Sequence, residues 1–102
     1  MRIYISGPIT KDKAFYNKFL DAEKKLKDAG YEVVNPAKLG VLLPKTFTHA
    51  DYMDIDLMLL RKCEAIYMLK NWKNSIGAVY ERMLAKELGM TIYYEVGKGG
   101  PI

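Results

Sequence analysis

Asp56 is the first residue whose place in the sequence suggests chemistry. The pattern over residues 48–63 predicts a helix, and at 100° per residue one side of that helix is apolar. The apolar arc comprises Tyr52, Ile55, Leu59, Leu60 and Cys63. Asp56 lies inside this arc, where a carboxylate is unfavourable unless a partner compensates its charge. Asp56 therefore either caps a neighbouring element or belongs to a site at which burial shifts its pKa.

Glu81 is the second such residue. A helix is predicted over residues 75–88, and its apolar arc comprises Ile76, Val79, Tyr80, Met83, Leu84 and Leu88. Glu81 lies at the margin of this arc. Helical side chains lean towards the N-terminus, and Gly77 and Ala78, which precede Glu81 by four and three residues, lack bulk. We expect open space above the Glu81 carboxylate, where a substrate could bind. The alternative is an ordinary surface glutamate paired with Lys or Arg.

Two stretches of main chain could hold a ligand beside these carboxylates. Ser75 begins the second helix, and the free N–H groups from Ser75 to Gly77 could bind a phosphate, although a serine that only caps its helix is the common case. The loop SGPIT (6–10) follows the first predicted strand, and its Gly7 lets a ligand approach the backbone. The loop matches neither a dinucleotide-binding GxGxxG pattern nor a Walker loop, so no cofactor is predicted.

The elements that must position these residues alternate along the chain. Strands are predicted over 3–5, 31–34, 65–69 and 91–94, and helices over 15–29, 48–63 and 75–88. This order predicts a single flavodoxin-like or Rossmann-like α/β domain (1–96) with a parallel four-stranded sheet, order 2-1-3-4, and three helices. The site is expected at the carboxyl ends of the strands, in loops 6–12, 35–47 and 70–74, of which 35–47 is long enough for a lid. Residues 97–102 are predicted to be a flexible tail.

Composition limits the function classes. The chain has 102 residues, a net charge of +4 and a pI near 9.1, but its lysines are scattered, so we expect a small-molecule ligand that bears phosphate and no direct nucleic-acid binding. Cys63, the single cysteine, is expected in the core, and His49 is expected to be structural. One cysteine and no long apolar run indicate a cytoplasmic protein without a membrane segment or metal cluster. A domain this small would gain stability as a homodimer or higher homo-oligomer.

Four segments together resemble a known family. They read YISGPIT (4–10), VVNPA (33–37), Asp56-Leu57 followed by CEAI (63–66), and SIGAVYE (75–81). The sequence resembles the nucleoside 2-deoxyribosyltransferase superfamily, which includes the deoxynucleoside 5′-monophosphate N-glycosidases, and most closely its short phage and bacterial members. The last segment is the most specific, because Ser, Gly, an aromatic residue and Glu all fall at the family spacing.

The resemblance implies a role for each candidate residue. Glu81 corresponds to the nucleophile, and Asp56 to the residue that handles the proton of the leaving base. Ser75 corresponds to the position that holds the 5′ end of the sugar, where serine is typical of the monophosphate hydrolases. The substrate-binding set that the resemblance and the loop pattern give is Gly7, Pro8, Ile9, Ser75 and Gly77.

The expected activity is cleavage of the base–sugar bond of a (deoxy)nucleoside 5′-monophosphate through a glycosyl-enzyme intermediate on Glu81. Two alternatives stay open. A nucleoside deoxyribosyltransferase would pass the sugar to a second base, and a non-catalytic nucleotide-binding protein would act as a sensor or a sponge. Tyr4, Trp72 and Tyr80 are candidates to stack on the base, although each is equally suited to the core or to an interface.

Overall fold

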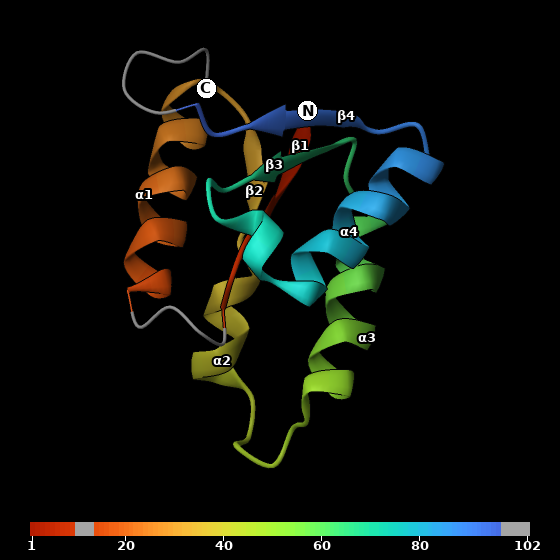
Figure 1. Ribbon diagram of the computed structural model, residues 1–102. Helices are drawn as coiled ribbons and strands as arrows, with labels where there is room; N and C mark the ends of the chain where they lie inside the picture. The colour runs from red at the N-terminus through yellow and green to blue at the C-terminus, as the bar shows by residue number, and fades with distance from the viewer. Residues whose placement is uncertain (10–13, 97–102) are drawn as a thin grey trace.

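Four parallel strands form one sheet in the order β2-β1-β3-β4 (Figure 1). The structure, a computed structural model, describes residues 1–9 and 14–96. The strands are β1 (Arg2–Ser6), β2 (Glu32–Val34), β3 (Ala65–Met68) and β4 (Thr91–Tyr94). The order predicted from the sequence is confirmed. β1 and β3 are central strands with mostly buried side chains, which explains their nearly continuous apolar sequences.

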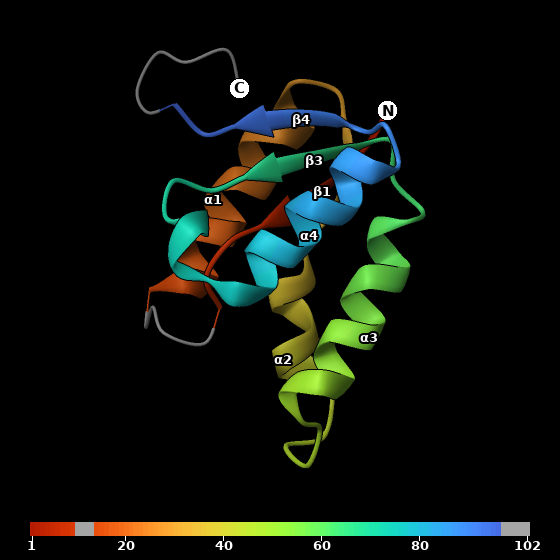
Figure 2. The same ribbon diagram turned by 45° about the vertical axis from the view of Figure 1, so that its right-hand side comes forward.

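Helices cover both faces of the sheet. Figures 1 and 2 show α1 (Phe15–Asp28) on one face and α3 (His49–Leu60) and α4 (Ile76–Glu87) on the other. Local sequence sets their ends: Thr48 and Asp51 form a reciprocal capping box on α3, and Ser75 caps α4 by accepting a hydrogen bond from the Ala78 N–H. Gly30 and Gly89 follow α1 and α4 with φ of 97° and 70°, conformations that favour glycine.

The segment 35–47 is more regular than the predicted loop. It contains η1 (Pro36–Lys38), a 3₁₀ turn, and the four-residue helix α2 (Leu39–Leu42). Asn35 starts η1 because its side chain accepts a hydrogen bond from the Ala37 N–H, and Pro36 suits the first helical position. A second 3₁₀ turn, η2 (Trp72–Asn74), occupies the predicted loop 70–74. Turns this short carry no periodic pattern, so hydrophobic periodicity could not predict them.

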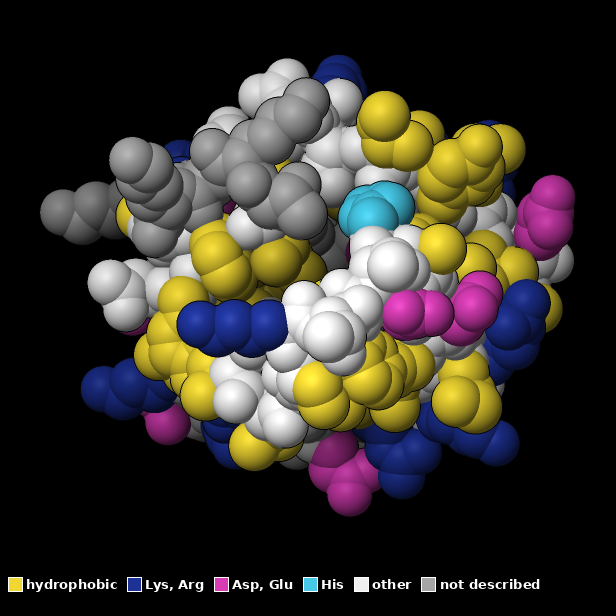
Figure 3. All heavy atoms as spheres, turned by 90° about the horizontal axis from the view of Figure 1, so that it is seen from below, with side chains coloured by type: hydrophobic (Ala, Val, Ile, Leu, Met, Phe, Trp, Pro, Cys, Tyr) yellow, Lys and Arg dark blue, Asp and Glu magenta, His cyan; other side chains and the backbone are white. Residues whose placement is uncertain are grey.

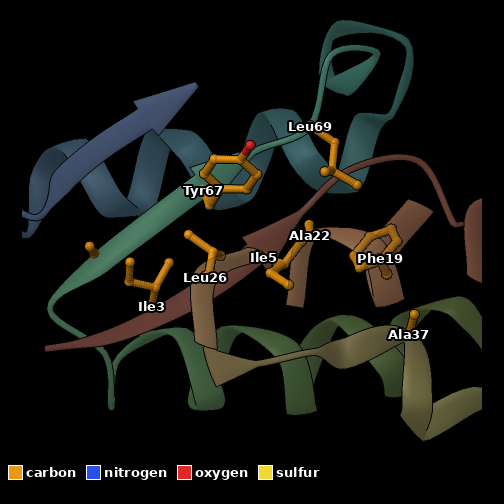
Figure 4. Packing of buried hydrophobic residues seen from close by; sticks show 9 residues of the cluster. Ile3, Ile5, Phe19, Ala22, Leu26, Ala37, Tyr67 and Leu69 are labelled. Carbon is orange, nitrogen blue, oxygen red and sulfur yellow. The ribbon is translucent and has the colours of Figure 1, made fainter. Parts of the chain in front are cut away.

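The alternation of β1 divides the core between the two faces. Ile3 and Ile5 point to the α1 face, where Figure 4 shows them with Tyr67 and Leu69 opposite the α1 side chains. Their buried partners on α1 are Phe19, Ala22 and Leu26. Tyr4 and Ser6 point to the α3–α4 face, where the buried apolar cluster includes Leu60, Cys63, Ile66, Met68, Ala78 and Ala85. The expectation that Cys63 is a core residue agrees with its burial.

The predicted burial of α4 is wrong for most of the apolar arc, of which Leu84 does pack against the core. Its buried residues are Ala78, Glu81 and Ala85, whereas Ile76, Tyr80, Met83 and the following Leu88 are all more than half exposed. Two alanines on the inner face let α4 approach the sheet closely, and Glu81 is tolerated there because hydroxyl groups of β1 satisfy it. Glu81 therefore lies at the centre of the buried face and not at its margin.

None of the helices within residues 1–9 and 14–96 is long and apolar enough to cross a membrane. The predicted tail (97–102) and Thr10 of the first loop lie outside the described residues.

Candidate active site

A cavity of about 350 Å³ opens beyond the carboxyl ends of β1, β2 and β3. This volume is within the range of small-molecule sites. Its walls come from the loop after β1, from η1 and α2, from α3 and the residues before it, and from the start of α4. The lining residues are Gly7, Ile9, Pro36, Ala37, Gly40, Phe47, His49, Tyr52, Met53, Asp56, Ser75, Gly77, Ala78 and Glu81. Figure 3 looks onto this end of the molecule, where hydrophobic side chains gather near the histidine.

Glu81 lines the cavity with its carboxylate held by two hydroxyl groups. The Tyr4 hydroxyl donates to Oε2 and the Ser6 hydroxyl donates to Oε1, each at 2.5 Å. Only 5% of Glu81 is exposed. Burial raises its pKa to about 7, the nearby Asp56 charge acts in the same direction, and the hydrogen bonds from Ser6 and Tyr4 oppose the rise. The two hydroxyl groups thus fix the direction of the carboxylate and favour its ionised form.

Asp56 lines the same cavity and differs from Glu81 in its hydrogen bonding. It is as buried as Glu81, yet its Oδ1 has no hydrogen-bond partner among the described residues. Burial raises the pKa of Asp56 to about 7. An unpartnered carboxyl oxygen in a cavity is available to a ligand, so Asp56 is placed to share a proton with whatever binds there.

The two carboxyl groups differ in which protonation state their surroundings favour. Glu81 receives two hydrogen bonds that stabilise its anion, whereas Asp56 receives none at Oδ1. When the pair holds one proton, that proton therefore favours Asp56. Burial, followed by the charges of Glu81 and Asp56, raises the pKa of Tyr4 well above its ordinary value, so Tyr4 stays a donor. The cavity thus holds an oriented carboxylate, Glu81, and a second carboxyl group, Asp56, on which a proton is favoured, as nucleophilic displacement with acid catalysis requires.

The start of α4 contributes the third wall. Ser75 and Gly77 line the cavity together with Ala78 and Glu81. The first N–H groups of a helix have no intrahelical acceptor and carry the positive end of the helix dipole. A Cβ on Gly77 would lie 3.1 Å from the Met53 Sδ, so a larger residue here would crowd the passage between α3 and α4. The open space that the sequence predicts in front of Glu81 thus coincides with this cavity.

The loop after β1 is only partly brought to the site. Gly7 and Ile9 line the cavity, but Pro8 between them lines a different cavity of about 220 Å³ on the α1 side. Successive residues of this segment face opposite sides, so Pro8 faces away from the cavity that Gly7 and Ile9 line. Pro8 is thus separated from the other four predicted binding residues. The sequence did not reveal that packing also requires glycine at position 7. A Cβ there would lie 2.8 Å from a Leu69 side-chain carbon.

The sequence left Tyr4, Trp72 and Tyr80 open between stacking on a base and a place in the core or at an interface, and none of the three lines the cavity. Tyr4 is fully buried and holds Glu81, Tyr80 is exposed on the outer side of α4, and Trp72 packs with its ring centroid 5.0 Å from the Arg82 guanidinium. The aromatic residues that line the cavity are instead Phe47 and Tyr52, whose ring centroids lie 6.1 Å apart.

Sequence reasoning also missed Ser6 and His49. Ser6 could have been found as a polar residue two positions after Tyr4 in an otherwise apolar strand, since both share one face. His49, which was expected to be structural only, lies at the start of α3 and lines the cavity. Among residues 1–9 and 14–96 no group of His, Cys, Asp and Glu side chains is arranged to hold a metal ion.

No curated protein matches this sequence. A solved structure of a 2-deoxyribosyltransferase from the psychrotolerant bacterium Bacillus psychrosaccharolyticus is similar with a TM-score of 0.76 and 18% sequence identity. The match covers 100% of this chain and 77% of that chain, and at this identity it shows a shared fold. A family profile matches residues 1–94, and by that match the chain belongs to the family described as domain of unknown function DUF4406.

Proposed function

We propose that this protein cleaves the N-glycosidic bond of a (deoxy)nucleoside 5′-monophosphate, with Glu81 as nucleophile and Asp56 as acid and base. The observation that carries the proposal is the buried Glu81 carboxylate, held by Tyr4 and Ser6 in a cavity that also contains the unpartnered Asp56 Oδ1. The shared fold with a 2-deoxyribosyltransferase supports it.

The reaction would proceed in two displacements at C1′ of the sugar. In the first, a Glu81 oxygen attacks C1′, the C1′–N bond breaks, and the base leaves with the bonding pair and a proton from Asp56. In the second, water attacks C1′ and gives a proton to Asp56, while the C1′–O bond breaks and its electron pair returns to Glu81. Burial supports both roles, because it raises the pKa of Asp56 to about 7, so that Asp56 can both give and take a proton near neutral pH, and because it excludes bulk water from the sugar ester.

Two features of the cavity bear on the substrate and on the acceptor. The α4 N-terminus with Ser75 favours an anionic group at the 5′ position. The described lining residues include no Lys or Arg, which favours the second candidate, a deoxyribosyltransferase that takes a free nucleoside and passes its sugar to another base. The two candidates share the Glu81 and Asp56 chemistry and differ in the 5′ group and in what attacks the sugar ester.

The test is release of free base from a panel of ribo- and deoxyribonucleoside monophosphates and the matching nucleosides, with and without an acceptor base, followed by chromatography. We expect Glu81→Gln to lower the rate at least about 10³-fold, because loss of a nucleophile has effects of this size or larger. Asp56→Asn should spare substrates whose base leaves without protonation. Glu32→Gln and Asp54→Asn are matched controls, since both residues are exposed, and they should retain full activity.

Two outcomes would overturn the proposal. One is base release that survives Glu81→Gln. The other is no release from any substrate by the wild type, with or without an acceptor. In the second case, substrate binding measured by calorimetry would distinguish the alternative of a non-catalytic nucleotide-binding protein from a protein without this ligand class. Mass spectrometry of protein quenched during turnover should show an adduct of one sugar phosphate, absent in Glu81→Gln.

A further inference from the structure

Glu23 is a buried carboxylate that the proposed chemistry does not use. It lies on α1, is 6% exposed, and is not among the residues that line the cavity of the candidate active site. Its Oε1 accepts a hydrogen bond from the Asn35 Nδ2 at 2.9 Å. Its Oε2 lies 2.6 Å from the Lys27 Nζ and 3.0 Å from the Lys38 Nζ. Two of these three partners belong to the segment 35–38, and the third lies one turn further along α1 itself.

Asn35 and Lys38 connect Glu23 to one wall of the cavity. The Asn35 side chain donates from Nδ2 to Glu23, and its Oδ1 accepts a hydrogen bond from the Ala37 N–H at 3.0 Å. A side-chain amide carries a donor and an acceptor in one rigid plane, so the contact with Glu23 also fixes the direction of Oδ1. Lys38 is the last residue of η1, and Pro36 and Ala37 within η1 line the cavity. Glu23 therefore holds η1 at both of its ends.

Stability alone does not explain a charged residue on this part of α1. Ala37 packs in the buried apolar cluster of the α1 face, which includes Phe19 and Ala22 (Figure 4). Removal of a carboxylate from water costs free energy that its ion pairs only partly return, and an apolar side chain of similar size is often equally stable. An apolar side chain, however, cannot fix the directions of the Asn35 and Lys38 donors. A buried charge of this kind instead selects one arrangement of the groups around it, here the conformation of η1.

We propose that Glu23 is a positioning residue that fixes η1 as a wall of the cavity and thereby sets the affinity of the site for its substrate. The effect on the substrate rests on the proposed function, whereas the effect on η1 does not. η1 carries neither of the candidate catalytic carboxylates, so a displaced η1 weakens the binding of substrate and of transition state alike. A uniform loss of this kind raises KM and leaves kcat nearly unchanged.

Hydrogen exchange of the Ala37 amide, followed by NMR, tests the positioning without any substrate. Glu23→Met leaves the Asn35 Nδ2 without its acceptor and should speed this exchange at least about tenfold, and Lys38→Met should speed it also. Lys27→Met is the matched control, because Lys27 pairs with the same Glu23 oxygen as Lys38 but lies on α1. It should leave the exchange rate of Ala37 within about twofold of the wild type.

The Ile5 amide in β1 is the internal reference, since exchange in a central strand reports global unfolding. The acceleration at Ala37 should exceed that at Ile5 in both Glu23→Met and Lys38→Met. Equal acceleration at the two amides would mean that Glu23 stabilises the fold as a whole. An Ala37 rate that Lys27→Met raises as much as Lys38→Met would mean that the lost charge, and not the hold on η1, is responsible. Either result would overturn the proposal.

Base release measured over a range of substrate concentrations tests the consequence for the substrate. Glu23→Met and Lys38→Met should raise KM about 3- to 30-fold, the effect of residues that act through a network of contacts, with kcat within about twofold of the wild type. Lys27→Met should keep both constants. A lower kcat at unchanged KM, or a KM that Lys27→Met raises as much as Lys38→Met, would contradict the role of Glu23.

A wild type that releases no base would contradict the proposed function, and calorimetry with nucleoside monophosphates and nucleosides then replaces the kinetics. The dissociation constant of whichever ligand binds should rise by the same factor, about 3- to 30-fold, in Glu23→Met and Lys38→Met. If none of these ligands binds, the effect on the substrate is wrong together with the proposed function, while the exchange rates at Ala37 still decide whether Glu23 positions η1.

Discussion

The proposed mechanism needs the Glu81 carboxylate in its ionised form, and two hydroxyl groups of β1 favour that form. Tyr4 and Ser6 each donate to one carboxylate oxygen. Burial works against them, and the balance leaves the pKa of Glu81 at about 7. If the proposed mechanism holds, Tyr4 and Ser6 are positioning residues that set the lower limit of the active pH range.

Tyr4→Phe tests this role at the scale of one hydroxyl group. The substitution keeps the buried ring but removes one donor, so the pKa of Glu81 should rise further. A hydrogen bond to a charged group contributes about 1.5–3 kcal/mol, which corresponds to a shift of about one to two pH units. The acidic limb of the profile of kcat/KM against pH should move up by that amount, with activity recovering at higher pH. Tyr16→Phe, on α1, should leave the profile in place. A lower rate at every pH without a shift would mean that Tyr4 serves packing only.

At the residue scale, the sequence could reveal the chemical groups but not how they are satisfied. Asp56 and Glu81 were predicted because a carboxylate among apolar neighbours is unusual. Ser6 and Tyr4 were not recognised as the partners of Glu81, because they lie far from it in the sequence. The separation is 75 positions for Ser6 and 77 for Tyr4. Only the packing of α4 on the sheet brings them together, and a single sequence does not contain that geometry.

At the scale of elements, the segments that follow β1 and β3 approach each other closely where Gly7 meets Leu69. A Cβ on Gly7 would lie 2.8 and 2.9 Å from Leu69 carbons, one of them the Leu69 Cβ, which cannot move without the backbone. We expect Gly7→Ala to lower the free energy of unfolding by about 1–3 kcal/mol, as overpacking does. Urea denaturation would measure this change.

The matched control for this substitution is Gly40→Ala on α2. Gly40 also lines the cavity, but a Cβ there meets no atom within 4 Å, and its φ is not positive. Its unfolding free energy should stay equal or rise slightly, because alanine restricts the unfolded chain. If Gly7→Ala is as stable as Gly40→Ala, the loop after β1 relaxes freely, and packing against Leu69 does not explain the glycine.

At the element scale, the sequence predicted the sheet and the ends of the helices because local chemistry determines both. The strands follow β-branched and aromatic runs, and the capping box of Thr48 and the cap of Ser75 are short-range signals. The orientation of α4 could not be predicted in the same way. Periodicity favoured burial of its larger apolar residues, whereas close approach to the sheet required the small ones, Ala78 and Ala85.

At the scale of the whole molecule, a carboxylate that does not line the cavity contributes a pH dependence of stability opposite to that of the two candidate catalytic carboxylates. Glu23 on α1 accepts hydrogen bonds from Lys27, Asn35 and Lys38, and so ties α1 to the turn η1 that lines the cavity. Burial opposes the ionisation of Glu23, but these three partners outweigh it and lower its pKa from 4.5 to about 2. The stability that Glu23 contributes is therefore complete above about pH 4.5 and is lost as the pH falls towards 2.

The pKa shifts of Glu81 and Asp56 have the opposite sign to that of Glu23. Their pKa values rise from 4.5 and 3.8 to about 7, so the native state holds more protons than the unfolded state between these limits. Their contribution is complete below the lower values and is lost as the pH rises towards 7. The proposed chemistry needs Glu81 ionised, so the molecule becomes active over the interval in which the site destabilises it, a common compromise between stability and activity.

The free energy of unfolding should therefore pass through a maximum between about pH 4 and 5 and fall on both sides. Glu23→Gln should remove much of the fall below pH 4.5, and the double variant Glu81→Gln/Asp56→Asn should remove the fall towards pH 7. At pH 8 the double variant should melt at least about 4 °C above the wild type, the shift that about 1 kcal/mol produces in a domain of this size, and at pH 4 the two should coincide. Glu32→Gln/Asp54→Asn changes two exposed carboxylates and should keep the fall of the unfolding free energy both below pH 4.5 and towards pH 7. A double variant less stable than the wild type at pH 8 would mean that Glu81 and Asp56 stabilise the fold, and the reason to regard them as a site maintained at the expense of stability would disappear.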